Sequence, residues 1–196
     1  KRALADSFPR TFLHADGQVV IAPFISFAVE VVPAFRCVDG TFITCHTADG
    51  GSWRSSNPQA EYRVLADLDS VYENKATDLA KMLKAWKRIC NVPLKSIVLE
   101  IVACSFVRQW PHNQQSIFWY DWMVRDFFAF LCQHKNRTVQ IPGLQETLNL
   151  GDQWVSRCES AYSRAVKACE YEYEDYGILA EDEWRKIFGD QFTRAF

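Results

Sequence analysis

One carboxylate in the first third of the chain has the surroundings of a metal ligand. Residues 26–32 alternate between apolar and other side chains, which predicts a strand, and Glu30 stands near its end. A sheet can hold such a carboxylate rigidly enough to bind a metal ion. A glutamate on a strand is more often turned to solvent, however, and the spacing alone leaves both interpretations open.

A lysine and a serine farther along the chain could together bind phosphate. Lys75 lies in the first turn of an expected helix, where a cation opposes the helix dipole. Ser96 lies in the first turn of the next helix, behind Pro93, and that helix start offers free N–H groups and a dipole that favours anions. Lys95 stands beside Ser96. The alternative is a solvated lysine and an ordinary helix-starting serine.

The elements that must position these residues change in kind near residue 57. Strands are expected at 19–21, 26–32 and 41–45, and they suggest a meander at one side of a sheet. Pro58 fits the first position of a helix that Asn57 could cap. Further helices are expected over 73–90, from Pro93, over 116–134, from 151 to 177 and over 181–188. The chain is therefore predicted to be α+β, with a β part at 1–56 and a helical part at 57–196.

The composition is that of a globular protein with mixed surface charge. The 196 residues include 22 basic and 24 acidic ones, a net charge of −2, so no global positive field attracts nucleic acid. Seven cysteines occur without a CxxC pair, and the four histidines lack metal-ligand spacing, which predicts free thiols in a reducing compartment. No apolar run approaches the ~20 residues that span a bilayer, and the polar start at Lys1 is unlike a signal peptide. We expect a cytoplasmic protein without a membrane partner.

One acidic motif has the residues of a nucleotidyltransferase signature but lies in the wrong type of secondary structure. Gly51-Ser52 is followed by Asp67-Leu68-Asp69, but the signature needs its aspartate pair on a strand so that both carboxylates can hold metal ions. Asp67 and Asp69 fall within an expected helix. They are predicted to be surface residues.

Several segments, in order, resemble the cGAS/DncV-like nucleotidyltransferases, the bacterial relatives of oligoadenylate synthetase. Residues 27–35, around Glu30, resemble the strand that carries this family's third catalytic carboxylate. Gly50-Gly51-Ser52-Trp53 and Ser56-Asn57-Pro58-Gln59-Ala60 resemble the strand and the helix entry that follow in this family. Residues 79–86 resemble a helix ending in Lys-x-Trp, and residues 94–100 resemble the helix after it. Asn149-Leu150-Gly151-Asp152 with Trp154 resembles the start of a C-terminal helix. The resemblance covers nearly the whole chain. It implies a partial polymerase-β-like nucleotidyltransferase palm followed by an α-helical, oligoadenylate-synthetase-like C-terminal lobe.

The resemblance also implies a role for each candidate residue. Glu30 would bind Mg²⁺ (or Mn²⁺) and help to activate the attacking ribose hydroxyl, although this position is usually aspartate. Lys75 and Ser96, 21 residues apart, would contact the donor triphosphate. A contact from Lys95 is inferred only from its neighbouring position. The residues expected near the base are Trp53, Ser55 and Ile97.

The motifs that mark the first half of the family's palm do not occur before Glu30 in this sequence. In this family Gly-Ser and Asp-x-Asp precede the third carboxylate, but the 29 residues before Glu30 contain neither motif. One carboxylate cannot hold the two metal ions of nucleotidyl transfer, so this chain alone is predicted to be inactive with ATP or GTP. The missing strands would leave an open sheet edge and exposed apolar surface. Such a surface favours association with the missing N-terminal half-palm or with another copy of the chain.

Two hypotheses about function follow. The leading one is the C-terminal portion of a bacterial antiphage enzyme that makes cyclic or linear oligonucleotide second messengers from nucleoside triphosphates and releases pyrophosphate. The alternative is a non-catalytic module, derived from that fold, that binds nucleotide or a partner protein. The sequence determines neither the bases joined nor the linkage, the activator or the oligomeric state.

Overall fold

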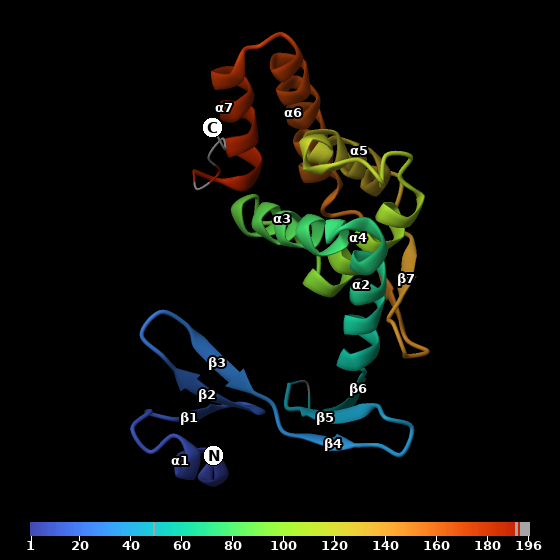
Figure 1. Cartoon of the computed structure of the whole chain (residues 1–196). Coiled ribbons are helices and arrows are strands. Elements are labelled where there is room, and N and C mark those ends of the chain that lie inside the picture. Colours follow the sequence, from blue (N-terminus) through green and yellow to red (C-terminus); the bar gives the residue numbers. More distant parts are fainter. Residues whose placement is uncertain (49, 191, 193–196) are drawn as a thin grey trace. The chain divides into compact units, whose positions relative to one another are not determined.

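The chain divides into two compact units, Lys1–Ala60 and Glu61–Phe196. The structure is a computed structural model, and it describes residues 1–48, 50–190 and 192 (Figure 1). The division falls within the first turn of α2 (Pro58–Tyr72), next to the change of structural type that the sequence places at residue 57.

The first unit contains two small antiparallel sheets and one short helix, α1 (Arg2–Ser7). Each sheet takes its three strands in chain order: β1 (His14–Asp16), β2 (Val19–Pro23) and β3 (Ala28–Val31) in the first, and β4 (Ala34–Arg36), β5 (Phe42–His46) and β6 (Ser52–Ser56) in the second. The single meander expected from the sequence is therefore wrong, because its last strand lies in a different sheet from the other two. Pro33 explains the break. It has no N–H to donate, so the ladder between β2 and β3 ends at Val31 and β4 pairs anew with β5.

Much of the apolar surface of the first unit is exposed. Leu13 and Ala22 are its buried apolar residues in the described part of the chain. Phe12, Phe27 and Phe35 are 78%, 59% and 69% exposed. Burial of apolar area is the main force that offsets the chain entropy lost on folding. The described residues of the first unit therefore supply only a small core of their own.

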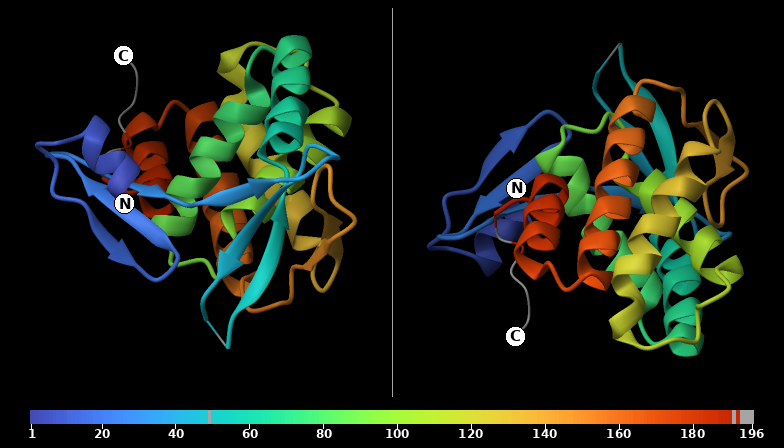
Figure 2. Two further views of the ribbon diagram at one scale, coloured as in Figure 1. Left: turned by 90° about the horizontal axis from the view of Figure 1, so that it is seen from below. Right: turned by 90° about the horizontal axis from the view of Figure 1, so that it is seen from above.

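The second unit is helical and has one small hairpin. After α2 come α3 (Lys75–Ile89), α4 (Ser96–Gln109), the 3-10 turn η1 (Ile117–Trp119), α5 (Tyr120–Cys132), the strands β7 (Thr138–Gln140) and β8 (Thr147–Asn149), α6 (Val155–Tyr173) and α7 (Gly177–Phe188). α6 packs against both α5 and α7, as Figure 2 shows. The sequence did not predict the hairpin, and α7 begins earlier than the expected residue 181. None of the helices in the described residues has both the length and the apolar character needed to cross a bilayer.

Large aromatic side chains from several helices form the core of the second unit. Trp86 of α3 and Trp154, just before α6, are fully buried, as are Phe127 and Phe128 of α5. The rings of Trp86 and Phe128 meet edge to face with their centroids 5.0 Å apart. The helix expected over 116–134 is thus present as α5, and its aromatic residues contribute to the core. Phe118, in the turn before it, is 89% exposed.

Candidate functional site

The start of α3 is fixed by an aspartate from the preceding helix. The Asp69 carboxylate of α2 accepts hydrogen bonds from the N–H groups of Ala76 and Thr77, each 3.1 Å long. Asp67 and Asp69 lie in a helix, as the sequence predicts. Asp67 is exposed, whereas Asp69 is half-buried because it caps α3. The cap fixes the position of α3 and therefore the face on which its lysines lie.

A basic hollow lies where the last turns of α3 meet the first turn of α4. Its volume is about 520 Å³. The Lys87 ammonium donates a hydrogen bond to Ser96 Oγ over 3.2 Å. Three cations around one hollow create a field that favours an anion, and lysine is a common phosphate ligand. The residues that line the hollow are Lys84, Lys87, Arg88, Asn91, Val92 and Ser96.

The start of α4 adds a second feature that favours anions. Ser96 is the first residue of α4, Lys95 is its N-cap, and the Lys95 side chain makes no capping hydrogen bond there. The first N–H groups and the positive end of the helix dipole can therefore serve an anion. Lys95 is exposed beside Ser96 but does not line the basic hollow. Ser96 thus has the setting that the sequence predicts, with Lys84 and Lys87 as its cationic neighbours.

Lys75 is buried outside the basic hollow. The residue is 1% exposed, and its Nζ donates to the carbonyl oxygen of Tyr72 over 3.3 Å. The same nitrogen lies 3.7 Å from a carboxylate oxygen of Glu73. Both partners belong to the junction between α2 and α3, so Lys75 stabilises that junction in this arrangement. Its predicted contact with a triphosphate stays a prediction.

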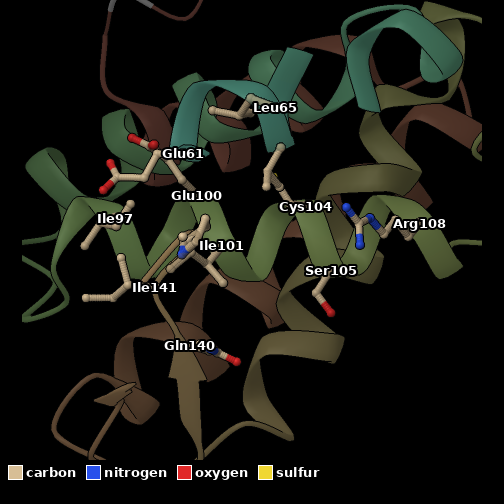
Figure 3. Close-up of a pocket in the computed structure, with 13 residues that line it drawn as sticks. Glu61, Leu65, Ile97, Glu100, Ile101, Cys104, Ser105, Arg108, Gln140 and Ile141 are labelled. Carbon is tan, nitrogen blue, oxygen red and sulfur yellow. The ribbon is translucent and has the colours of Figure 1, made fainter. Parts of the chain in front are cut away.

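A second pocket, the acidic pocket, is formed by α2, α4 and the segment after β7 (Figure 3). It has a volume of about 420 Å³, and Glu61 and Glu100 place two carboxylates at one end of it. The Lys84 ammonium lies 2.5 Å from a Glu100 carboxylate oxygen. One ion pair therefore joins a residue of the basic hollow to a residue of the acidic pocket. The apolar part of the pocket lining includes Leu65, Ile97, Ile101 and Ile141.

The two carboxylates give one end of the acidic pocket a character opposite to that of the basic hollow, although Arg108 also lines the pocket. Burial, and then the charge of Glu100, raise the pKa of Glu61 above its usual value. A pocket with carboxylates and apolar walls suits a flat ligand with N–H donors better than it suits an anion. Ser96 and Ile97 are consecutive on α4, yet Ser96 lines the basic hollow and Ile97 the acidic pocket.

The remaining predicted site residues lie in the first unit. Glu30 is exposed on β3, where it pairs with Ile21 of β2. Trp53 and Ser55 lie two residues apart on β6 and therefore share one face of the strand. Trp53 is 65% exposed, and its ring meets that of Phe35 edge-on with centroids 6.0 Å apart. The base contacts predicted for these residues and for Ile97 stay predictions.

Glu30 does not complete a metal site by itself. Among the described residues there is no cluster of three or more His, Cys, Asp or Glu side chains that could hold a metal ion. A two-metal nucleotidyl-transfer site needs several carboxylates, and Glu30 supplies one. The donors among the described residues therefore do not fit Mg²⁺ binding by this chain alone. The predicted role of Glu30 as a metal ligand depends on carboxylates from another segment.

Sequence reasoning overlooked Lys84 and Lys87 as partners of Ser96. The signal was present, because Lys84 is the lysine of the Lys-x-Trp motif at the end of α3. Lys87 follows three residues later and so lies on the same face of the helix. Their closeness to Ser96 depends on how the chain turns between α3 and α4, and helical spacing does not encode that turn.

Comparison with known proteins identifies the fold. No family model matches the sequence, and neither does any curated protein. The structure of Escherichia coli MS115-1 CdnC with ATP matches with a TM-score of 0.68 and 15% identity, over 98% of this chain and 71% of that one. The structure of Vibrio cholerae DncV cyclic AMP-GMP synthase in complex with the linear intermediate pppA(3′,5′)pG matches with a TM-score of 0.75 and 12% identity. The match covers 98% of this chain and 57% of that one. Escherichia coli DncV in its 3′-deoxy GTP bound form matches with a TM-score of 0.72 and 14% identity, over 98% of this chain and 55% of that one.

These matches establish the fold of the chain. CdnC and DncV are both cGAS/DncV-like nucleotidyltransferases. The resemblance read from the sequence is therefore confirmed at the level of fold, as is the α+β class. The chain spans just over half the length of the two DncV structures and about 70% of the CdnC structure.

Proposed function

We propose that this chain is the C-terminal portion of a bacterial antiphage nucleotidyltransferase that makes cyclic or linear oligonucleotides from nucleoside triphosphates. The observation that carries the proposal is the basic hollow at the start of α4, in a chain with the fold of CdnC and DncV. The structures of those two proteins hold ATP, 3′-deoxy GTP and a linear dinucleotide that carries a triphosphate. A site for a triphosphate is what this reaction requires of the helical unit.

In this proposal the basic hollow holds the donor triphosphate. Lys87 and Arg88 neutralise phosphate charge, and the Ser96 hydroxyl and the first N–H groups of α4 donate hydrogen bonds to phosphate oxygens. Lys84 is held near the hollow by Glu100. The carboxylates of the acidic pocket would then accept hydrogen bonds from N–H donors of a base. Lys95, beside Ser96, is a further candidate phosphate ligand, and Lys75 would become one only if its ammonium left its contacts with Tyr72 and Glu73.

The first unit would supply Glu30 to the reaction but needs a partner segment. Its exposed apolar side chains and small core fit a surface that packs against the first half of a nucleotidyltransferase palm. That half would bring the Gly-Ser and Asp-x-Asp motifs that the residues before Glu30 lack. A second copy of this chain is the other candidate for the same surface. The seven free thiols fit the reducing cytoplasm.

A non-catalytic module is the alternative function. Glutamate at position 30, where the family usually has aspartate, is what this alternative predicts. The module would bind a nucleoside triphosphate in the basic hollow without transferring it. The two functions differ in whether pyrophosphate is released when the chain is joined to a segment that contains Gly-Ser and Asp-x-Asp.

The first prediction tests the basic hollow. Lys87→Ala is expected to weaken the binding of ATP or GTP by about 10- to 100-fold, because a charge-assisted hydrogen bond contributes about 1.5–3 kcal/mol and 1.4 kcal/mol is a factor of ten. Isothermal titration calorimetry of the pure chain measures the affinity. Lys81→Ala is the matched control: Lys81 lies on the same helix but is exposed and pairs with Asp78. Equal affinities for the two variants would contradict the proposed site.

The second prediction concerns Lys75. Lys75→Met removes a buried ammonium and fills the same space with apolar atoms, so we expect the free energy of unfolding to rise or to stay within about 1 kcal/mol of the original. Urea unfolding followed by circular dichroism measures it. Nucleotide affinity is expected to change by less than about twofold, since Lys75 is buried and does not line the basic hollow. A loss as large as that of Lys87→Ala would instead make Lys75 a triphosphate ligand.

A further inference from the structure

Two cysteines at the junction of α5 and α6 lie in near-bonding contact. Cys132 is the last residue of α5, and Cys158 lies in the first turn of α6. Their sulfur atoms are 2.9 Å apart, whereas a disulfide bond is about 2.05 Å long. An approach of about 0.9 Å therefore separates the two thiols from a covalent bond. Both belong to the second unit, so their closeness is a property of one compact body.

We propose that Cys132 and Cys158 are a thiol modification site, which a peroxide oxidises to an intramolecular disulfide. The burial of the two residues gives them different parts in the reaction. Cys132 is half-buried, so a small oxidant reaches it more readily than it reaches Cys158, which is fully buried. A peroxide therefore reacts with Cys132 first, and Cys158 then reacts with the oxidised Cys132.

The reaction balances with hydrogen peroxide as the oxidant. The Cys132 thiolate attacks one peroxide oxygen, the O–O bond breaks, and Cys132 becomes a sulfenic acid as hydroxide leaves. The Cys158 sulfur then attacks the Cys132 sulfur, the S–O bond breaks and water leaves. In sum, two thiols and one hydrogen peroxide give one disulfide and two waters. The two sulfur atoms lose the two electrons that the peroxide gains.

The electrostatics around the pair favour the same order of events. The hydrogen bond from Cys158 lowers the pKa of the Cys132 thiol, while burial and the charge of Glu159 oppose that effect. The same hydrogen bond and then burial raise the pKa of the Cys158 thiol. While Cys132 keeps its proton, Cys158 Sγ donates to the carbonyl oxygen of Phe128 over 3.3 Å, and once Cys132 is a thiolate the Cys158 proton can turn to it. Cys132 is therefore the better nucleophile of the two.

The other cysteines of the second unit are poorly suited to the same reaction. Burial raises the pKa of Cys104 to about 11 and that of Cys169 to about 12. Burial also raises the pKa of Cys90, whose sulfur contacts the carbonyl oxygens of Lys186 and Ile187. A thiol that keeps its proton reacts slowly with peroxide. Oxidation of this unit should therefore select Cys132.

The disulfide would act on the segment between the two cysteines. That segment contains the β7–β8 hairpin, and Gln140 and Ile141 of the hairpin line the acidic pocket. A covalent link between Cys132 and Cys158 closes this segment into a loop and so restricts the conformations it can reach when it opens locally. The modification would thus stabilise the segment that supplies one wall of the acidic pocket.

Peroxide treatment of the reduced chain tests the proposal. We expect the intact mass to fall by about 2 Da and the unfolded protein to show two fewer thiols than its original seven, both reversed by dithiothreitol. Peptide mapping should place the bond between Cys132 and Cys158. Free Cys132 and Cys158 in a sample in which other cysteines are oxidised would overturn the proposal, and so would a bond mapped to another pair.

Serine variants separate the parts of the two thiols. Cys158→Ser should leave Cys132 as a sulfenic acid that dimedone labels, whereas Cys132→Ser should leave Cys158 reduced and unlabelled. Cys90→Ser is the matched control and should form the disulfide as the original chain does. Equal dimedone labelling in the two test variants would contradict the assigned order. Because mapping of the original chain needs no substitution, a variant that fails to fold does not decide the result.

Discussion

Glu30→Gln is expected to lower the rate of nucleotidyl transfer by about 100-fold or more when the chain is joined to a segment that carries Gly-Ser and Asp-x-Asp. The substitution keeps the size and shape of the side chain and removes its negative charge. Glu30 would act through its negative charge, as a ligand for the metal ion that helps to activate the ribose hydroxyl, so the neutral amide cannot replace it. Release of pyrophosphate from ATP and GTP measures the rate.

Glu30→Asp is the matched control for this experiment. It keeps the charge and installs the residue that the resembled family usually has at this position, so we expect activity within about 10-fold of the original assembly, in contrast to the loss in Glu30→Gln. Because Glu30 is exposed on β3, neither variant should alter the folding of the chain. Equal activity of the Gln and Asp variants would remove Glu30 from the catalytic residues.

The same assay also distinguishes the two candidate functions. The chain alone is expected to release no pyrophosphate, since Glu30 is one carboxylate without partners in the described residues. Activity in the joined assembly supports the enzyme. Nucleotide binding there without any transfer supports the non-catalytic module. Robust transfer by the pure 196-residue chain would contradict the need for a partner segment.

Helical periodicity predicted most of the second unit, because apolar stripes at helical spacing report which face is buried. The expected helix over 73–90 contains α3, and the helix expected over 116–134 contains α5. The pairing of the strands in the first unit could not be predicted as well from the sequence. The alternation around Glu30 correctly predicted a strand, but alternation does not say which strand is its neighbour. Pro33 marks where one ladder ends, but no local signal shows that the next strand pairs in a different sheet.

The prediction of the candidate phosphate site was limited in the same way, because contacts between helices cannot be read from local sequence signals. Ser96 was predicted correctly as a helix-starting residue, since Pro93 and the following apolar positions are local signals. The choice of Lys75 as its partner was not local. It required knowledge of the turn between α3 and α4, which instead brings Lys87 to Ser96. The role of Asp69 as a cap of α3 depends likewise on a contact between two helices.

Trp154→Ala is expected to lower the free energy of unfolding of the second unit by about 3–5 kcal/mol, because it empties the space of a fully buried indole. The Trp154 Nε1 also donates a hydrogen bond to the carbonyl oxygen of Leu150 over 2.8 Å, which ties the end of the hairpin segment to the start of α6. Urea unfolding followed by the helical signal in circular dichroism measures the loss. A change below about 1 kcal/mol would contradict the assignment of Trp154 to the core.

Two phenylalanine variants separate packing from the hydrogen bond. Trp154→Phe keeps most of the aromatic volume but removes the donor to Leu150, whereas Trp86→Phe makes a similar change at a buried indole whose Nε1 has no hydrogen-bond partner in the described residues. A buried acceptor left without its donor costs about 1–3 kcal/mol. Trp154→Phe should therefore destabilise the second unit more than Trp86→Phe does. The reverse order would mean that the space each indole fills, and not the bond to Leu150, decides how strongly these positions hold the helical unit together.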